Sequence, residues 1–339
     1  MKSVSSKLVN ERYMRLAVLL GLVIACAAVA QPVAGASKSY ISFSPRMAPI
    51  GAKRKSSPDS VTLSPCGRRL AVVVGNGWKS WLEIRDTATH RKMREFADTG
   101  PDGAVRWHPT KWRLLTTNWS ANRPAYYIAN LGTGKRRKLF RGVIHPYCWA
   151  KSGMLTPNEV VILNASTGRI IRSGNFGYRI PWKQPWDKAE VVRLSCGPGD
   201  RVAAEIWDWY APHGGKGRPK RLEVYRKAPN RIKWVRIGRI DAKVQNGKEI
   251  WFPSNPNFLA DGNLVYLRIR PDQDDRAEVW LSSPDGKRQR KVLTLTDLYS
   301  LVGNRSVDWF TIDRAGRTIC YISGYRVNIL RLSKPLSSN

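Results

Sequence analysis

Acidic residues are scarce in this chain of 339 residues. Asp and Glu number 25 against 58 Lys and Arg, which gives a formal net charge of +33 at pH 7. A field of this sign attracts polyanions such as nucleic acids, anionic lipid head groups and acidic glycans. The cations are spread along the whole sequence and match no nucleic-acid-binding motif. We therefore expect a general electrostatic bias and no specific nucleic-acid recognition.

Residues that carry catalysis or bind metals are also sparse. The four histidines (His90, His108, His145 and His213) lack the spacing of metal ligands, and no Cys-x-x-Cys pair is present. The Gly-x-Ser-x-Gly motif of serine hydrolases is missing as well. We therefore predict no catalytic residue, no metal site and no cofactor, and we favour a non-enzymatic protein.

Long apolar runs are missing except near the N-terminus. Residues 16–30 form an uncharged apolar run of 15 residues that follows a basic segment and ends in Ala28-Val29-Ala30. Because a membrane span needs about 20 apolar residues, this arrangement predicts a signal peptide over residues 1–30. We expect an exported protein, periplasmic or extracellular. The alternatives are an uncleaved anchor or lipidation at Cys26, and the chain would reach a membrane only through such an anchor.

Four cysteines lie beyond this segment, at Cys66, Cys148, Cys196 and Cys320. In an exported protein they can form disulfides, and four cysteines allow three pairings. The spacing does not choose among these pairings.

A repeated unit of short strands and turns occupies most of the chain. In the first copy, residues 61–96, an apolar strand leads into Ser64-Pro65-Cys66-Gly67, and a β-branched run and an alternating hairpin follow. Similar units begin near residues 105, 147, 191, 257 and 307. Most intervals are close to the length of about 40–45 residues that is typical of a four-stranded propeller blade. We predict an all-β fold, a six-bladed β-propeller of four-stranded antiparallel blades over residues 58–333.

The last copy lacks its fourth strand, because the pattern ends near Arg331. An unpaired strand edge is a liability for a folded protein. The alternating segment near residues 40–44 can supply the missing strand, and we expect it to close the ring. The rest of residues 31–57 is then a basic linker, and residues 334–339 are a tail. The alternative is that residues 40–44 are linker too.

The turns resemble the repeat of TolB-type β-propellers. Ser64-Pro65-Cys66-Gly67 and Ser283-Pro284-Asp285-Gly286 are similar to the S-P-D-G turn of that repeat. The resemblance covers about residues 58–333 and implies the propeller fold. It implies little about function, because the matching residues are turn formers. WD-repeat propellers are the nearest alternative, but their Gly-His and Trp-Asp signature is missing.

Two groups of side chains are candidates for binding. The loops between second and third strands, and between blades, are rich in aromatic residues beside polar donors, which suits sugar stacking or a peptide groove. The ligand-binding candidates of these loops are Trp78, Trp119, Arg123, Trp182, Trp186, Trp207, Trp209, Tyr210, His213, Trp251 and Arg270. The alternative is that the loops bury these rings as a local lid.

The second group consists of cations at the tight turns and outer strands. We expect these side chains to face a polyanion or to form a solvated surface that discourages edge pairing. They are Lys135, Arg136, Arg137, Lys138, Lys287, Arg288 and Arg290.

The leading hypothesis is an exported, monomeric binding platform for an envelope protein segment or a glycan. One alternative is an enzyme that acts on acidic polysaccharides. The resemblance to TolB-type propellers extends to oligogalacturonate lyases, which hold a metal on channel histidines, and His145 and His213 would be the residues to contribute. Another alternative is a protein that binds anionic surfaces or polymers through its charge alone.

Overall fold

The structure is a computed structural model, and the residues it describes belong to the unit Gly35–Asn339, one of two units into which the chain divides. The described ranges are 36–43, 46–47, 53–54, 56–76, 79–97, 105–118, 125–141, 148–150, 153–155, 160–163, 170–172, 189–208, 218–227, 234–246, 248–273, 275–296, 298, 309–323 and 325–336. Over these ranges the chain forms strands and turns, and no helix there is long and apolar enough to cross a membrane.

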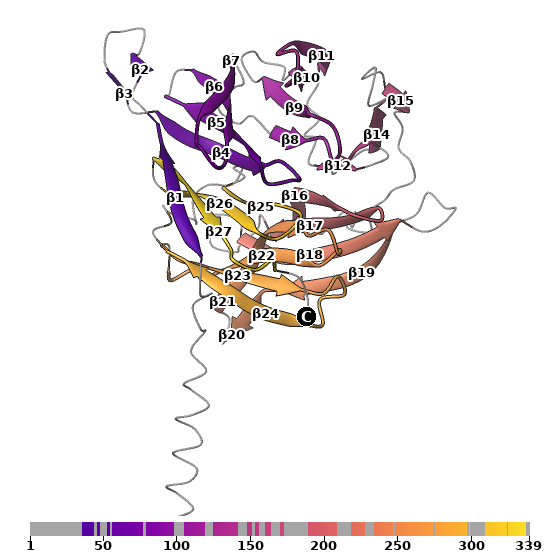
Figure 1. Cartoon of the computed structure of the whole chain (residues 1–339). Helices are drawn as coiled ribbons and strands as arrows, with labels where there is room; N and C mark the ends of the chain where they lie inside the picture. The colour runs from indigo at the N-terminus through magenta and orange to yellow at the C-terminus, as the bar shows by residue number, and fades with distance from the viewer. Residues whose placement is uncertain are drawn as a thin grey trace, which may run out of the picture. The chain divides into compact units, whose positions relative to one another are not determined.

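The fold is an all-β propeller, and five blades of four or five antiparallel strands are well defined in the described part (Figure 1). The first two blades consist of β4 (Ser57–Leu63), β5 (Arg69–Gly75), β6 (Ser80–Asp86) and β7 (Lys92–Ala97), and of β8 (Val105–Trp107), β9 (Arg113–Asn118), β10 (Ala125–Asn130) and β11 (Arg136–Arg141).

Two further blades follow later in the chain. They consist of β16 (Ala189–Gly197), β17 (Arg201–Asp208), β18 (Arg218–Lys227) and β19 (Trp234–Asp241), and of β20 (Lys243–Gln245), β21 (Lys248–Phe258), β22 (Leu264–Ile269), β23 (Ala277–Ser282) and β24 (Gln289–Leu295). The last blade combines β1 (Ser37–Ser42) with β25 (Phe310–Ile312), β26 (Thr318–Ser323) and β27 (Arg326–Arg331).

Shorter strands complete the described structure. The strands β12 (Cys148–Ala150), β13 (Gly153–Leu155), β14 (Val160–Leu163) and β15 (Ile170–Arg172) form one more sheet, and β2 (Arg46–Met47) pairs with β3 (Lys53–Arg54). The inner strands contact one another in the cyclic order β4, β8, β12, β16, β21, β25 and back to β4. This closed cycle of inner strands is the arrangement that defines a propeller.

The same tight turn recurs in several blades, after the first strand at Ser64 and Asp313 and between β23 and β24 at Ser283. Backbone hydrogen bonds join Ser64 N to Arg69 O at 2.8 Å, Ser283 N to Arg288 O at 2.9 Å and Asp313 N to Thr318 O at 3.0 Å. Gly67, Gly286 and Gly316 adopt φ values of 71°, 77° and 67° within these turns. Only glycine reaches this region without strain. The Ser-Pro-x-Gly motif is therefore a folding element, as the sequence predicts.

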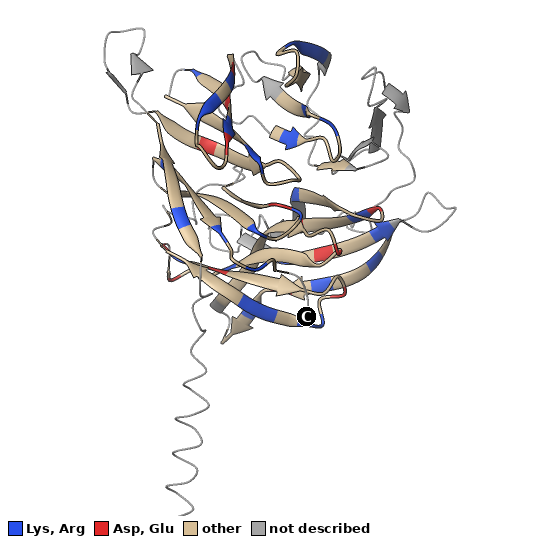
Figure 2. Cartoon of the chain, in the orientation of Figure 1, with Lys and Arg blue, Asp and Glu red and all other residues tan. Residues whose placement is uncertain are grey.

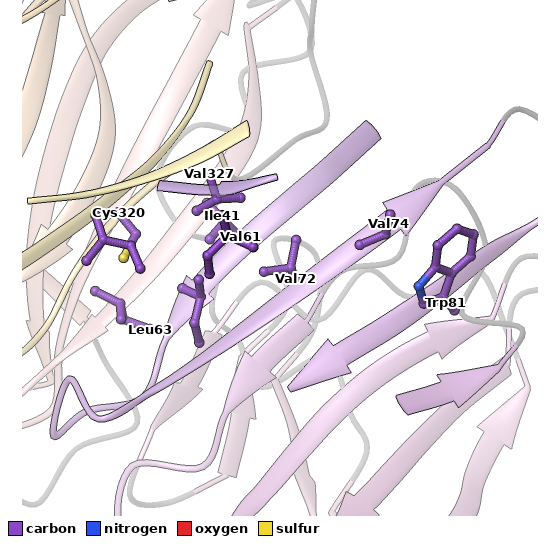
Figure 3. Packing of buried hydrophobic residues seen from close by; sticks show 10 residues of the cluster. Ile41, Val61, Leu63, Val72, Val74, Trp81, Cys320 and Val327 are labelled. Carbon is purple, nitrogen blue, oxygen red and sulfur yellow. The ribbon is translucent and has the colours of Figure 1, made fainter. Parts of the chain in front are cut away.

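The apolar run of β5 is buried on both of its faces. Leu70, Val72 and Val74 pack in a cluster with the last blade (Figure 3). Ala71 and Val73, on the opposite face, pack in a cluster with the second blade. A middle strand between two neighbouring blades has no solvent face, so its sequence is continuously apolar and does not alternate.

The N-terminal strand closes the last blade. β1 pairs antiparallel with β27, with Tyr40 opposite Asn328 and Ile41 opposite Val327 (Figure 1). Ile41 is 3% exposed and packs against the first and last blades. The strand spans Ser37–Ser42, whereas the sequence places it near residues 40–44.

The segment after β27 also docks on the last blade. Leu336 is buried, and its backbone N–H donates to Gly316 O at 3.0 Å. The residue lies in the stretch expected as a tail, 334–339, so part of that stretch packs on the turn of the last blade.

One disulfide joins two neighbouring inner strands. Cys148 on β12 bonds to Cys196 on β16, with a Cα–Cα distance of 5.4 Å. Cys66 is an exposed free thiol and Cys320 a buried one. The structure therefore selects one pair from the pairings that the sequence leaves open.

Candidate functional site

A pocket of about 140 Å³ lies where the inner strands converge. Its lining comes from β4, β8, β12, β16, β21 and β25, and it reaches the turns that follow three of these strands, at Pro65, Pro109 and Arg314. Because the inner strand of every sheet in the cycle contributes, this pocket is the mouth of the central channel. We refer to it as the channel-mouth pocket.

Among the residues that the structure describes, three arginines and no Asp or Glu line the channel-mouth pocket. Arg106 lies on β8, Arg193 on β16 and Arg314 in the turn after β25. Positive charges that line a concave site reinforce one another. The described lining of the pocket is therefore biased toward positive charge.

Arg193 is fixed from behind by a buried carboxylate. Its Nη1 donates to Glu205 Oε2 at 2.9 Å, and Glu205 has no exposed surface. The same carboxylate accepts hydrogen bonds from Ser254 Oγ at 2.8 Å and from Asn255 N at 2.8 Å, across the junction of two blades. These contacts hold the guanidinium in one orientation, which reduces the entropy that a ligand must remove on binding.

Arg314 is held through its backbone. Its N–H donates to Pro65 O at 3.2 Å, and its carbonyl accepts from Ala260 N at 2.8 Å. The turn is thus tied to the equivalent turns of the blades on either side. Burial lowers the pKa of Arg314, but a guanidinium starts so high that it stays charged at neutral pH. No hydrogen bond or ion pair joins its side chain to another residue in the described ranges.

The aromatic walls of the pocket are packed in place. Trp107 is 8% exposed, and its Nε1 donates to Thr62 O at 3.0 Å on the neighbouring inner strand. Trp149 is 5% exposed and lies edge-on to His108, with ring centroids 4.7 Å apart. These rings shape the pocket but leave little of their faces open.

Most of the loop residues predicted to bind a ligand lie outside the described residues. These are Trp78, Trp119, Arg123, Trp182, Trp186, Trp209, Tyr210 and His213. The sequence predicts Trp207 in a loop, but its backbone lies on strand β17. Arg270 is exposed just after β22.

Trp251 is the described member of that group whose ring contacts can be read. It lies on β21, and the guanidinium of Arg268 lies 3.9 Å from its ring centroid and 3.4 Å from that of Trp280. Arg268 also donates from Nη2 to Gln289 Oε1 at 2.6 Å. This stack of rings and cation spans neighbouring strands of one blade, and such contacts stabilise a sheet.

The predicted polyanion-facing cations divide between two blades. Lys135, Arg136, Arg137 and Lys138 lie on β11 and the turn before it, and Lys287, Arg288 and Arg290 lie on β24 and the turn before it. All are exposed except Arg136, which stacks on Tyr127 at 4.8 Å and donates to Ala97 O at 2.8 Å. The structure therefore shows two separate cationic edges and does not gather these residues in one site.

The structure offers no metal centre within its described ranges, where no group of three or more His, Cys, Asp or Glu side chains converges. His145 and His213 lie outside those ranges. His108 is occupied in a turn, where its Nδ1 accepts from Thr110 N at 3.1 Å and Lys111 N at 3.0 Å. His90 shares a hydrogen bond of 3.1 Å with Ser39 Oγ.

Sequence reasoning did not single out the arginines of the channel-mouth pocket. Arg106 and Arg193 lie on the first strands of their repeat units, and Arg314 lies in the first turn of its unit. A comparison of the repeat copies position by position contains the signal, because first strands line the channel of a propeller. What the sequence did not provide was the cyclic contact that brings these three units together.

Comparisons with known proteins assign no family. No protein-family model matches the chain, and no curated protein matches it. Among solved structures, the β-propeller domain of the trilobed protease from Pyrococcus furiosus is 10% identical, with a TM-score of 0.47 over 84% of this chain and 98% of that one. TolB from Acinetobacter baumannii is 12% identical, with a TM-score of 0.35 over 93% and 68%.

The similarity to a propeller of the WD40 type has a comparable TM-score. The Cps50 (Swd1) β-propeller domain from Myceliophteria thermophila is 13% identical, with a TM-score of 0.45 over 86% of this chain and 99% of that one. Values this low carry no argument about function. The chain is a β-propeller on its own strand pairing, with structural similarity to TolB, WD40 and peptidase propellers.

Proposed function

We propose that this protein is an exported binding platform that recognises an anionic partner, a protein segment or glycan of the cell envelope, at the channel-mouth pocket. The proposal rests on the convergence of Arg106, Arg193 and Arg314 on one pocket whose described lining residues include no carboxylate. Propellers commonly present a rigid ring of strands whose central mouth receives ligands.

The distribution of the acidic residues supports an anionic partner. Glu83 on β6 is 4% exposed and accepts hydrogen bonds from Trp81 Nε1 at 2.9 Å and Arg85 Nε at 2.7 Å. Glu223 on β18 and Glu278 on β23 pair with neighbouring cations in the same way. These three carboxylates are thus paired within their blades, and Lys and Arg outnumber Asp and Glu along the chain (Figure 2).

The contacts of Glu223 determine its ionisation state. Burial of Glu223 opposes ionisation, but hydrogen bonds from Tyr225 and Arg221 outweigh it and lower the pKa of Glu223. The carboxylate therefore stays ionised and neutralises a cation of its own blade. Cations elsewhere on the surface are left to attract a partner.

The disulfide supports the exported location. Bonds such as Cys148–Cys196 persist in oxidising compartments and are rare in the cytosol. Together with the predicted signal peptide over residues 1–30, this favours a periplasmic or extracellular protein, and lipidation at Cys26 is the alternative route to the envelope.

We also infer that the chain is a six-bladed, TolB-like propeller in which β12–β15 is the third blade. The inner strand β12 contacts β8 on one side and β16 on the other. The repeat interval in the sequence also places a unit at this position.

Direct binding tests the proposed function. The purified chain is titrated with labelled poly-glutamate, polygalacturonate and neutral dextran, at low salt and at about 0.5 M salt. The proposal expects saturable binding of an acidic polymer and none of dextran. Failure of both acidic polymers to bind a folded protein would contradict the proposal. Release of new reducing ends from polygalacturonate would instead indicate the enzymatic alternative.

A further inference from the structure

We propose that the channel-mouth pocket binds a peptide carboxylate, either an acidic side chain or a free C-terminus of an extended segment. This inference rests on the proposed function and names the chemical class of its ligand. It follows from the arginines, the size and the walls of the pocket.

Carboxylate recognition follows from the cations. A guanidinium presents two parallel N–H donors that match the two oxygens of a carboxylate, which a lysine ammonium does not do. Arg106, Arg193 and Arg314 line one small space, and every positively charged residue of its described lining is an arginine. Glu205, which pairs with Arg193, is fully buried and is not among the lining residues. The described lining therefore presents cations and no carboxylate to an incoming anion.

The pocket has room for a small group. Its volume is about 140 Å³. One carboxylate on a short apolar stem fits such a space. Leu63 and Ile312 line the pocket and contribute apolar edges to its wall.

The walls favour a peptide over a sugar. Sugar rings bind by stacking on open aromatic faces, whereas Trp107, Trp149 and Phe310 are 8%, 5% and 2% exposed. Rings buried to this extent offer edges and no platform. A peptide needs no such platform, because its side chain or terminus enters the pocket and its backbone stays outside.

The site is also organised before a ligand arrives. The Glu205 contacts fix Arg193, and backbone bonds to Pro65 and Ala260 fix the turn of Arg314. A ligand that meets fixed donors loses less binding energy to ordering than one that meets mobile side chains. The two arginines therefore act as a rigid pair of walls.

Three glycine-rich probe peptides, each with an acetylated N-terminus, separate the two sources of the carboxylate. The first has one glutamate and an amidated C-terminus, the second has glutamine and a free C-terminus, and the third has glutamine and an amidated C-terminus. Each is labelled and titrated into the full-length protein by fluorescence anisotropy. Binding of the first indicates an acidic side chain, and binding of the second indicates a terminus. If neither binds better than the third, the inference is wrong.

Arg314→Gln tests the pocket itself, and Arg317→Gln is its matched control. Arg317 is exposed in the same turn and does not line the pocket. We expect Arg314→Gln to weaken the preferred peptide on the order of tenfold, equal to about 1.4 kcal/mol, and Arg317→Gln to leave its affinity unchanged. Equal effects of the two variants would mean that only the general surface charge matters and would overturn the inference.

The double variant Arg106→Gln/Arg314→Gln keeps the test informative if one arginine compensates for the other. It should abolish peptide binding while its melting temperature stays close to that of the wild type. Arg193 is left intact, because its removal would strand the buried Glu205. If acidic polymers bind the wild type and the double variant equally, the protein is still a binder of anions, but at another surface, and the pocket inference fails.

Discussion

Arg193 and Glu205 form a buried ion pair, with Nη1 and Oε2 2.9 Å apart and the carboxylate fully removed from solvent. Replacing one partner leaves the other charge buried without compensation. We expect Arg193→Met to lower the free energy of unfolding by about 3–5 kcal/mol. Urea denaturation followed by circular dichroism measures this loss.

The exposed pair Arg239–Asp241, with a 2.7 Å contact, is the control. Its side chains are 47% and 54% exposed, so Arg239→Met should cost less than about 1 kcal/mol. Equal losses in the two variants would show that the burial of Glu205 does not determine the energy of its pair.

The free energy of unfolding should depend on pH through His108. Burial first, and then the charges of Lys111 and Arg113, lower the pKa of His108 from 6.5 to about 4. The unfolded chain takes up this proton at a higher pH than the folded protein. The contribution of His108 is therefore complete above a pH of about 6.5 and is lost as the pH falls toward about 4.

The measurement is the free energy of unfolding against pH for the wild type and His108→Ser. Serine opens the equivalent turn at Ser64 and accepts the turn N–H there, so the variant keeps the turn. Between these pH values, the wild type should lose at most about 3 kcal/mol more than the variant. Parallel curves would show that His108 does not titrate between the folded and unfolded states.

The disulfide between Cys148 and Cys196 should contribute substantially to stability. It closes a loop with a sequence separation of 48 residues. A crosslink of this length restricts the unfolded chain, and its loss typically costs about 2–4 kcal/mol. Guanidinium denaturation of Cys148→Ser/Cys196→Ser measures this cost. Cys66→Ser removes an exposed free thiol and is the control; a Cys148→Ser/Cys196→Ser midpoint equal to that of the control would refute the prediction.

Strand β1 should be essential to the last blade. A chain that begins at residue 36 keeps β1, and a chain that begins at residue 44 lacks it. The shorter chain exposes the edge of β27 and loses the buried Ile41, so we expect a loss of at least about 3 kcal/mol and concentration-dependent aggregation. Differential scanning calorimetry and light scattering compare the two. Equal melting temperatures would mean that β1 adds nothing to the blade.

Local chemistry made much of the fold predictable. The turns at Ser64 and Ser283 can be predicted from their residues alone. Proline restricts the backbone to the angle that the turn needs, and glycine permits the positive φ that follows. The alternation around Tyr40 signalled the closing strand. Its start at Ser37 was missed, because an edge strand that faces solvent tolerates polar residues such as Ser37 and Lys38 and shows no clear boundary.

The candidate site was less predictable, because it depends on contacts between distant repeats. Arg106, Arg193 and Arg314 come from three sheets and meet only when the inner strands form a cycle. Trp251 illustrates the same limit, since its stacking on Arg268 depends on neighbouring strands of a blade. A single sequence contains the side chains but not these cross-strand and cross-blade neighbours.

The pairing of β1 with β27 has a consequence for the order of folding. During synthesis β1 emerges before every other strand of the propeller, and its partner β27 emerges after all of them. β1 must therefore wait unpaired while the remaining strands are made. A contact of such sequence separation is slow to form. Ring closure is thus the final step of maturation, and a chain interrupted before Arg326 retains two unsatisfied strand edges for chaperones or proteases to recognise.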